Sequence, residues 1–281
     1  MKNFFNGWYM KCQSKEHTVA VIPAVHQKNG QKSCSIQLIT ENGVWMAKMP
    51  GNIFCRDKRG ISIGENRFSQ RGIRLHLVTS RLDAKGELRF GPLSSLRYDI
   101  MGPFALIPFL ECKHRVFSMK HLVTGTLSIN GRSYCFDHDW GYWEGDCGYS
   151  FPKEYAWTQC CFPGGSLMLS VADIPMAGFH FTGTIAVVMW HGREYRMATY
   201  LGARVIHIQR GKLRIRQGDM ELEAWLLEAA HQPLQAPVAG DMGRTIHESA
   251  VCRAYYRFRK GNRILFAFET RKASFEYEYA L

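Results

Sequence analysis

Short segments in which apolar and polar residues alternate run along the whole chain. They are rich in β-branched and aromatic residues and are separated by turn-forming residues, a pattern typical of antiparallel strands. Asn42-Gly43 and Asn130-Gly131 each lie between two such segments, and Asn-Gly in this position predicts a tight hairpin. The pattern predicts an all-β protein with strands over residues 18–25, 34–40, 44–49, 73–79, 122–129, 133–136, 167–172, 179–189, 195–200, 204–209, 212–216, 252–258 and 264–269.

One segment, residues 221–231, fits two structures. Leu222, Trp225, Leu226 and Ala229 follow helical spacing, which predicts a short helix over the mouth of a barrel. The same residues can also be read as a strand, because short apolar runs do not separate the two periodicities.

The order of features repeats between the two halves of the chain. Each half begins with a strand that contains a tryptophan, followed by a strand that ends in Ile-Pro and by a hairpin. Two strands with alternating basic residues and a final hairpin complete each half. The matching positions are Trp8 with Trp157, Cys12 with Cys161, and Pro23 with Pro175. Any two β-rich halves can be aligned loosely, which is the alternative. Our interpretation is two consecutive lipocalin-like antiparallel β-barrel or sandwich domains, 1–147 and 148–281.

Composition limits the class of partner. The chain has 281 residues, 46% of them hydrophobic, which is enough for a substantial core, and a net charge of +12. This positive charge is compatible with three alternatives: a nucleic-acid partner, contact with an anionic membrane surface, or a basic protein with neither partner. The densest basic runs, 56–59 and 253–263, are short and belong to no nucleic-acid motif. We therefore expect no nucleic-acid partner and retain peripheral membrane contact, and nothing in the sequence implies a protein partner.

Cysteine and histidine spacing predicts neither disulfides nor a metal site. The nine cysteines are odd in number and irregularly spaced, which favours reduced, mostly buried thiols. Glu111, Cys112 and His114 form the one close grouping, and strand alternation would turn Glu111 away from the other two. No apolar run approaches the roughly 20 residues of a membrane span. Residues 1–15 lack the character of a signal peptide, so we expect a cytoplasmic protein.

Residues 134–161 carry the densest candidate chemistry. Within them lie three tryptophans and five carboxylates: Trp140, Trp143, Trp157, Asp137, Asp139, Glu144, Asp146 and Glu154. Rings that line a cavity and a buried acid that keeps its proton would suit a site acting on a large apolar molecule. The alternative is a tight turn between two half-buried strands, with the tryptophans in the core and the carboxylates in solvent.

The segment 141–160, GYWEGDCGYSFPKEYAWTQC, resembles the E-K-x-W-G-x-S-F-P-x-x-x-x-W-x-Q-C signature of the tocopherol cyclase family. The resemblance implies tandem lipocalin-type barrels, a prenylated quinol or related isoprenoid as ligand, and closure of a chroman ring without a cofactor. Further matches follow in order along the chain: Phe5, Gly7, Trp8, Tyr9, Lys11, Glu111, Cys112, His114, Ser118, Met119, His121, Ala198, Thr199, Tyr200, Ala236, Pro237, Gly240, Met242, Ile246, Glu248 and Ser249.

Glu144 matches the carboxylate of this signature and is the predicted acid. Protonation of an alkene needs a neutral carboxylic acid, aromatic faces beside the cation and exclusion of water. Burial of the flanking Tyr142 and Trp143, predicted to bind substrate, would raise the pKa of Glu144. Its alternative is a surface glutamate in a glycine-rich turn. Asp146 shares the face of Glu144 if the segment is extended, and we expect it to orient a hydroxyl group.

His121 is the predicted neutral base. It lies on an otherwise apolar alternating face with Phe117, Met119 and Val123, so it should point inwards. A buried neutral histidine could accept the phenol proton or hold the quinol hydroxyl. The alternative is a core histidine whose hydrogen bonds are satisfied.

Five further residues are predicted to contact substrate. The resemblance implies this role for Glu111, His114 and Ser118. Trp157 and Gln159 share one face of a predicted strand, which suits a ring-lined wall with one amide for a polar head group, although a cross-strand core is equally consistent.

Cys147 departs from the family pattern. It replaces the signature tryptophan, which weakens the inference of a tocopherol-type substrate more than that of the fold. A non-catalytic lipocalin-like carrier of a small hydrophobic ligand is the alternative function.

Overall fold

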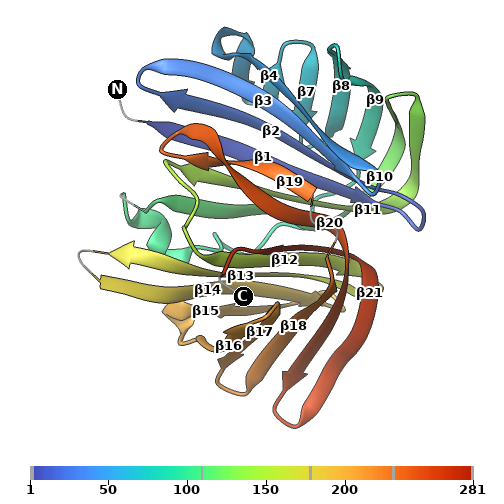
Figure 1. Cartoon of the computed structure of the whole chain (residues 1–281). Helices are drawn as coiled ribbons and strands as arrows, with labels where there is room; N and C mark the ends of the chain where they lie inside the picture. The colour runs from blue at the N-terminus through green and yellow to red at the C-terminus, as the bar shows by residue number, and fades with distance from the viewer. Residues whose placement is uncertain (1–2, 109, 177–178, 230–231, 280–281) are drawn as a thin grey trace. The chain divides into compact units, whose positions relative to one another are not determined.

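The structure is a computed structural model that describes residues 3–108, 110–176, 179–229 and 232–279. It is all-β, as predicted, and the described residues contain no α-helix (Figure 1). Three short 3-10 helices interrupt the strands: η1 (Gly51–Ile53), η2 (Gly102–Leu106) and η3 (Thr199–Leu201). Every predicted strand overlaps an observed one, but residues 199 and 200 lie in η3.

The first sheet contains eleven antiparallel strands in the order β4-β3-β2-β1-β11-β10-β9-β8-β7-β6-β5. The first strand therefore pairs with the last. The bounds are β1 Phe4–Gln13, β2 Thr18–Lys28, β3 Gln31–Thr40, β4 Gly43–Pro50, β5 Phe54–Asp57, β6 Gly60–Ile63, β7 Asn66–Ser69, β8 Gly72–Val78, β9 Asp83–Phe90, β10 Cys112–Ile129 and β11 Arg132–Gly148.

The second sheet has ten strands in the order β15-β14-β13-β12-β21-β20-β18-β17-β16, with β19 pairing to β20. Its first strand along the chain, β12, again pairs with its last, β21, so the two sheets correspond in this feature of their strand order. The bounds are β12 Tyr155–Phe162, β13 Gly165–Met176, β14 Phe179–Trp190, β15 Arg193–Ala198, β16 Arg204–Gln209, β17 Lys212–Gln217, β18 Met220–Glu228, β19 Gln232–Val238, β20 Asp241–Lys260 and β21 Arg263–Tyr277.

In the ambiguous segment, residues 221–228 form no helix and belong to the strand β18. Its backbone pairs with β17 on one side and β20 on the other, which satisfies the groups that a helix would have paired internally. His231, at the end of that segment, lies outside the described residues, as do the side chains of Met242 and Glu248 from the family pattern.

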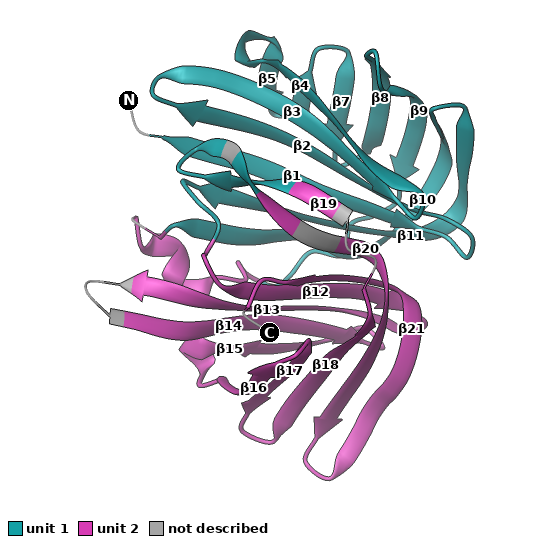
Figure 2. Ribbon diagram, viewed as in Figure 1, with its two compact units in different colours: residues 1–97, 111–151, 235–244 teal, residues 98–110, 152–234, 245–281 magenta. Residues whose placement is uncertain are grey.

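Contacts divide the chain into two compact units, each assembled from separate segments (Figure 2). Unit 1 contains residues 1–97, 111–151 and 235–244, and unit 2 contains 98–110, 152–234 and 245–281. The predicted boundary near residue 147 falls within the end of β11, the last strand of the first sheet along the chain, before β12 begins the second sheet. The division into domains 1–147 and 148–281 stays a prediction.

The first sheet encloses one core. Buried residues from its early, middle and late strands belong to a single apolar cluster, among them Ile36, Ile63 and Leu88. The ring of Trp8 on β1 stacks on Phe54 of β5 with centroids 6.2 Å apart, so strands distant in the sheet order meet across the interior. Burying each large apolar side chain contributes about 1.5–3 kcal/mol, which favours this curled sheet over a flat one.

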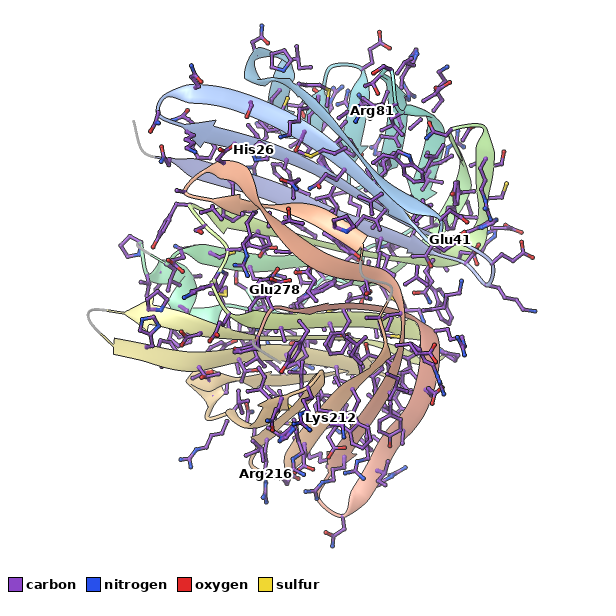
Figure 3. The ribbon with its side chains drawn as sticks, viewed as in Figure 1. His26, Glu41, Arg81, Lys212, Arg216 and Glu278 are labelled. Carbon is purple, nitrogen blue, oxygen red and sulfur yellow. The ribbon has the colours of Figure 1, made fainter. Side chains whose placement is uncertain are left out.

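Surface strands of unit 2 show the alternation on which the prediction rests. On β17 the buried Leu213 and Ile215 alternate with the exposed Lys212 and Arg216, both labelled in Figure 3. Such alternation gives a strand one apolar and one solvated face.

A β-bulge in β11 decides which side chains face the core. Val123 pairs with Asp139 and Gly125 with Phe136, so β11 carries one residue more than β10 between these pairs, and His138 has a positive φ of 55°. Phe136 points into the core before the bulge and Trp143 after it. The extra residue thus turns the following even-numbered positions to the opposite face of the sheet, which carries Tyr142, Glu144 and Asp146.

All nine cysteines are free, five of them buried. Cys147, at the position of the signature tryptophan, is exposed. Among the described residues, no helix has the length and apolar character needed to cross a membrane.

Candidate functional site

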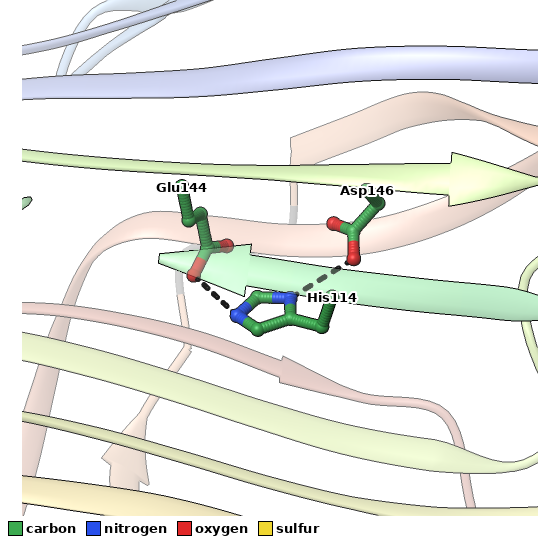
Figure 4. Close-up of side chains that lie close together, drawn as sticks. All are labelled: His114, Glu144 and Asp146. Carbon is green, nitrogen blue, oxygen red and sulfur yellow. Dashed lines mark hydrogen bonds and ion pairs between the residues drawn. The ribbon is translucent and has the colours of Figure 1, made fainter. Parts of the chain in front are cut away.

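One imidazole ring lies between two carboxylates on adjacent strands. The β10–β11 register places His114 directly across from Asp146, and Glu144 is two residues earlier on the same face of β11. His114 Nδ1 lies 2.9 Å from Asp146 Oδ1, and its Nε2 lies 3.1 Å from Glu144 Oε2 (Figure 4). The predicted shared face of Glu144 and Asp146 is confirmed, because this part of β11 is extended despite its glycines.

Two further groups extend this cluster. The hydroxyl of Tyr142, at the preceding position on the same face, donates a hydrogen bond to Glu144 Oε2. At the other end the thiol of Cys112 lies 3.6 Å from Asp146 Oδ1. The result is a continuous line of groups that can donate or accept protons, running along two strands.

Burial controls the protonation of the cluster. Glu144 is only 4% exposed, and this burial raises the pKa of its carboxyl group against the opposing effects of His114 and Tyr142. Burial by itself lowers the pKa of His114, but Glu144 and Asp146 outweigh it and hold that pKa well above its usual value.

Glu144 Oε2 has two neighbours in the cluster. It accepts a hydrogen bond from the Tyr142 hydroxyl and lies 3.1 Å from His114 Nε2 in an ion pair.

The same three residues could be considered as a metal site, since one ligand atom of each lies within 4.8 Å of the others. The two carboxylates, however, face different nitrogens of His114 (Figure 4). A metal ion binds one imidazole nitrogen, while the other nitrogen takes a supporting hydrogen bond. His114 Nε2 and a carboxylate oxygen of Glu144 could thus bind a metal ion. Asp146 would then accept a hydrogen bond from the other nitrogen of the ring. The predicted absence of a metal stays a prediction.

His121 and Ser118 form a separate pair on the core face. An added Cβ at Gly141 would lie 2.3 Å from His121 Nε2 and 2.7 Å from the core residue Val123, which confirms that His121 points inwards. Its Nδ1 is 3.0 Å from Ser118 Oγ, and that oxygen accepts the amide of Ser94 at 3.1 Å. Burial lowers the pKa of His121 to about 4, so the ring is neutral at physiological pH. Its predicted role as a base stays a prediction.

Trp143 and Glu111 are held by other contacts. Trp143 faces the core, where its ring stacks on Phe117 at 4.7 Å, so of the two aromatic neighbours in sequence only Tyr142 shares the face of Glu144. Successive residues of a strand point to opposite faces, so Trp143 and Glu144 lie on different faces of β11. The carbonyl oxygen of Glu111 accepts the amide of Tyr149 at 2.9 Å, closing the start of β10 against the end of β11.

Trp157 and Gln159 belong to unit 2 and share one face of β12, as predicted. The alternate positions Ala156 and Cys160 belong to the core of unit 2. Gln159 is fully buried and donates through Nε2 to Cys161 Sγ at 3.3 Å. Their predicted role in substrate binding stays a prediction.

A cavity in unit 1 was not anticipated from the sequence. It has a volume of about 760 Å³ and is lined by the rings of Trp8, Phe68, Phe117 and Trp143 together with the turns around 56–60 and 67–71. Trp8, which the sequence repeat matches with Trp157, forms part of this wall. The basic run at 56–59 was a sequence feature that could have pointed to this cavity. Its position near Trp8, however, depends on how the sheet curls. Glu144 is not among the lining residues.

No family model matches the sequence, and no curated protein matches it. Several solved structures match this chain, and they share its fold. A candidate AttH protein from Nitrosomonas europaea aligns with a TM-score of 0.54 at 10% identity over 100% of this chain and 93% of its own. CghA aligns with a TM-score of 0.59 at 8% identity, and CghA with Sch210972 with 0.57 at 9%, each over 98% of this chain and 88% of CghA.

Proposed function

We propose that this chain is an enzyme of the tocopherol cyclase type, which binds a prenylated quinol or a related isoprenoid and adds a hydroxyl group across an alkene of the same molecule. The observation that carries the proposal is the buried carboxyl group of Glu144, held between the Tyr142 hydroxyl and the His114 ring. Burial raises the pKa of this carboxyl group and so favours its protonated form, which is the state that alkene protonation needs.

The proposed reaction conserves protons. The carboxyl group of Glu144 gives its proton to the less substituted carbon of the alkene, which leaves a tertiary cation. The phenol oxygen attacks this cation, a carbon–oxygen bond forms, and the phenol proton returns to Glu144. No external acid, oxidant or cofactor enters the balance.

The neighbours of Glu144 have distinct roles in this proposal. After proton transfer the Glu144 carboxylate is stabilised by the Tyr142 hydroxyl and by the His114 imidazolium at 3.1 Å. Asp146 holds Nδ1 of His114 at 2.9 Å and thereby fixes the orientation of the ring. Asp146 is thus a positioning residue, which modifies the expectation that it orients a substrate hydroxyl.

The shared fold supports a small apolar ligand as partner. CghA, one of the structural neighbours, was determined with Sch210972, so a protein of this fold has been observed with a ligand. A cytoplasmic location at the surface of a membrane, where an isoprenoid would be taken up, belongs to the proposal.

A specific observation favours a second function, that of a carrier. The cavity of about 760 Å³ in unit 1 has the size of a ligand pocket, yet Glu144 does not line it. A carrier would use this cavity and perform no chemistry.

Turnover in heavy water separates the two functions. We would incubate the protein with a monoprenyl hydroquinone in D2O and analyse the product by mass spectrometry and chiral chromatography. An enzyme yields a single enantiomer of the chroman with one deuterium on the protonated carbon. Glu144→Gln should lose this activity, while Glu65→Gln, an exposed matched control, should retain it. Racemic product, or equal product from both variants, would refute the proposal and leave the carrier.

A further inference from the structure

The cavity of unit 1 combines an aromatic interior with a basic rim. The rings of Trp8 and Phe68 line it from β1 and β7, and those of Phe117 and Trp143 from β10 and β11. Phe117 and Trp143 are stacked, so their faces form one continuous apolar wall. This wall can hold a flat or chain-like hydrocarbon body.

The rim has a strong excess of positive charge. Five basic residues and one acidic residue line the cavity, and the basic ones are Arg56, Lys58, Arg59, Arg67 and Arg71. Asp57 lies 3.7 Å from Arg67 and offsets one of them. The guanidinium of Arg56 lies 5.8 Å from the centre of the Trp8 ring, which brings positive charge directly onto the aromatic wall.

We propose that this cavity binds an amphipathic anion, a molecule with an apolar body and an oxyanion head group. The body lies against the rings of Trp8, Phe117 and Trp143, and the head group binds the arginines at the rim. Guanidinium groups match the geometry of carboxylate and phosphate oxygens, so both kinds of head group share this chemistry. An aromatic cavity behind the charge favours a small molecule over an extended membrane surface as the occupant.

This site is independent of the proposed reaction. The cavity lies on the core face of β11, whereas Glu144 and Asp146 lie on the opposite face, and neither lines the cavity. A binding measurement therefore tests the cavity without requiring turnover.

The experiment compares three molecules with the same hydrocarbon chain: farnesol, farnesoic acid and farnesyl monophosphate. Quenching of tryptophan fluorescence reports binding, because two tryptophans line the cavity. We expect both anions to bind at least tenfold more tightly than the alcohol at low ionic strength, with the difference falling at 1 M salt. The preference between acid and phosphate identifies the head group.

Variants locate the effect. Arg59→Gln combined with Arg71→Gln should reduce the preference for the anions to about twofold or less, and both residues are exposed, so folding should be retained. Arg204→Gln with Arg216→Gln removes the same charge from exposed positions in unit 2 and should leave the preference unchanged. Trp143→Phe leaves a smaller ring in the aromatic wall, and we expect a loss of severalfold in affinity.

Three results would overturn the proposal. Equal affinity for farnesol and the two anions would show that the rim does not select charge. An equal effect of the two double variants would show that only the net charge matters. Binding to anionic phospholipid vesicles that requires Arg59 and Arg71, without discrimination between farnesol and its acid, would assign the rim to a membrane surface.

Discussion

The interiors of the two units differ although their strand orders correspond. In the core of unit 2 aromatic rings pack against one another at tilted angles, with Phe162 lying 5.0 Å from Phe266 and 4.6 Å from Phe268. In unit 1 the rings of Trp8 and Phe117 line a cavity instead. The same framework of strands can thus be packed for stability or left open for a ligand, and the choice rests on a few side chains.

A second contrast concerns two tyrosine–glutamate contacts. In unit 1 Tyr142 donates to Glu144, which also faces the His114 ring. In unit 2 Tyr155 donates to Glu276 at 2.5 Å. What distinguishes Glu144 is the imidazole fixed by Asp146, so the comparison assigns the proposed chemistry to unit 1.

The largest expected effect is on turnover. Glu144→Gln removes the proposed acid, and general acid catalysis contributes about 10²–10⁴-fold, so we expect a fall of about a thousandfold in kcat for chroman formation. Glu276→Gln should change kcat by no more than about twofold. Comparable losses in the two variants would show that the tyrosine–glutamate contact, and not the histidine cluster, matters.

The packing contrast predicts the next effect. Phe258→Ala in unit 2 removes a fully buried ring and should lower the free energy of unfolding by about 3–5 kcal/mol. Phe117→Ala in unit 1 removes a partly buried ring at a cavity wall, and we expect a loss of about 1–2 kcal/mol. Urea denaturation measures both, and similar losses would mean that the cavity wall is packed as tightly as the core of unit 2.

Acid should weaken unit 1 selectively. Burial lowers the pKa of both His26 and His121 from 6.5 to about 4. The unfolded chain therefore binds protons at these sites between pH 6.5 and 4 while the folded chain does not, and each site costs up to about 3 kcal/mol of stability across this window. His114, whose pKa is raised, is protonated in both states there and adds no loss on acidification.

Hydrogen exchange followed peptide by peptide would test this prediction. Protection in the strands of unit 1 should fall between pH 6.5 and 4 after correction for the intrinsic rate, and His121→Gln should remove about half of the fall. His180, His191 and His207, the histidines of unit 2 whose side chains the structure describes, are exposed, so strands β14 and β16, which contain or border them, provide the internal control. A fall of equal size in both units would contradict the assignment to the buried histidines.

The smallest expected effect tests the fit of His121 within unit 1. Gly141→Ala would place a methyl group 2.3 Å from His121 Nε2, so the ring must move, at a cost of about 1–2 kcal/mol. Gly7→Ala would meet Ala24 at 3.7 Å, an ordinary contact, and should change stability by less than about 0.5 kcal/mol. An unchanged unfolding midpoint for Gly141→Ala would show that His121 is loosely held.

The sequence alone determined the strands, the hairpin at Asn130-Gly131 and the shared face of Glu144 and Asp146. These features depend on local backbone geometry, since alternation has a period of two residues and Asn-Gly adopts the positive φ angles found at this turn, 51° and 81°. The same alternation placed segment 134–161, which is rich in tryptophans and carboxylates, on two strands that follow one another along the chain, β11 and β12.

Only the tertiary structure decided the rest. The β10–β11 register places His114 between the two carboxylates, and the bulge at His138 sets which face Glu144 occupies. Curling of the first sheet brings the basic run at 56–59 to the same cavity as Trp8 and Trp143. Each of these contacts joins residues far apart along the chain, so it depends on pairing and closure, which local periodicity does not encode.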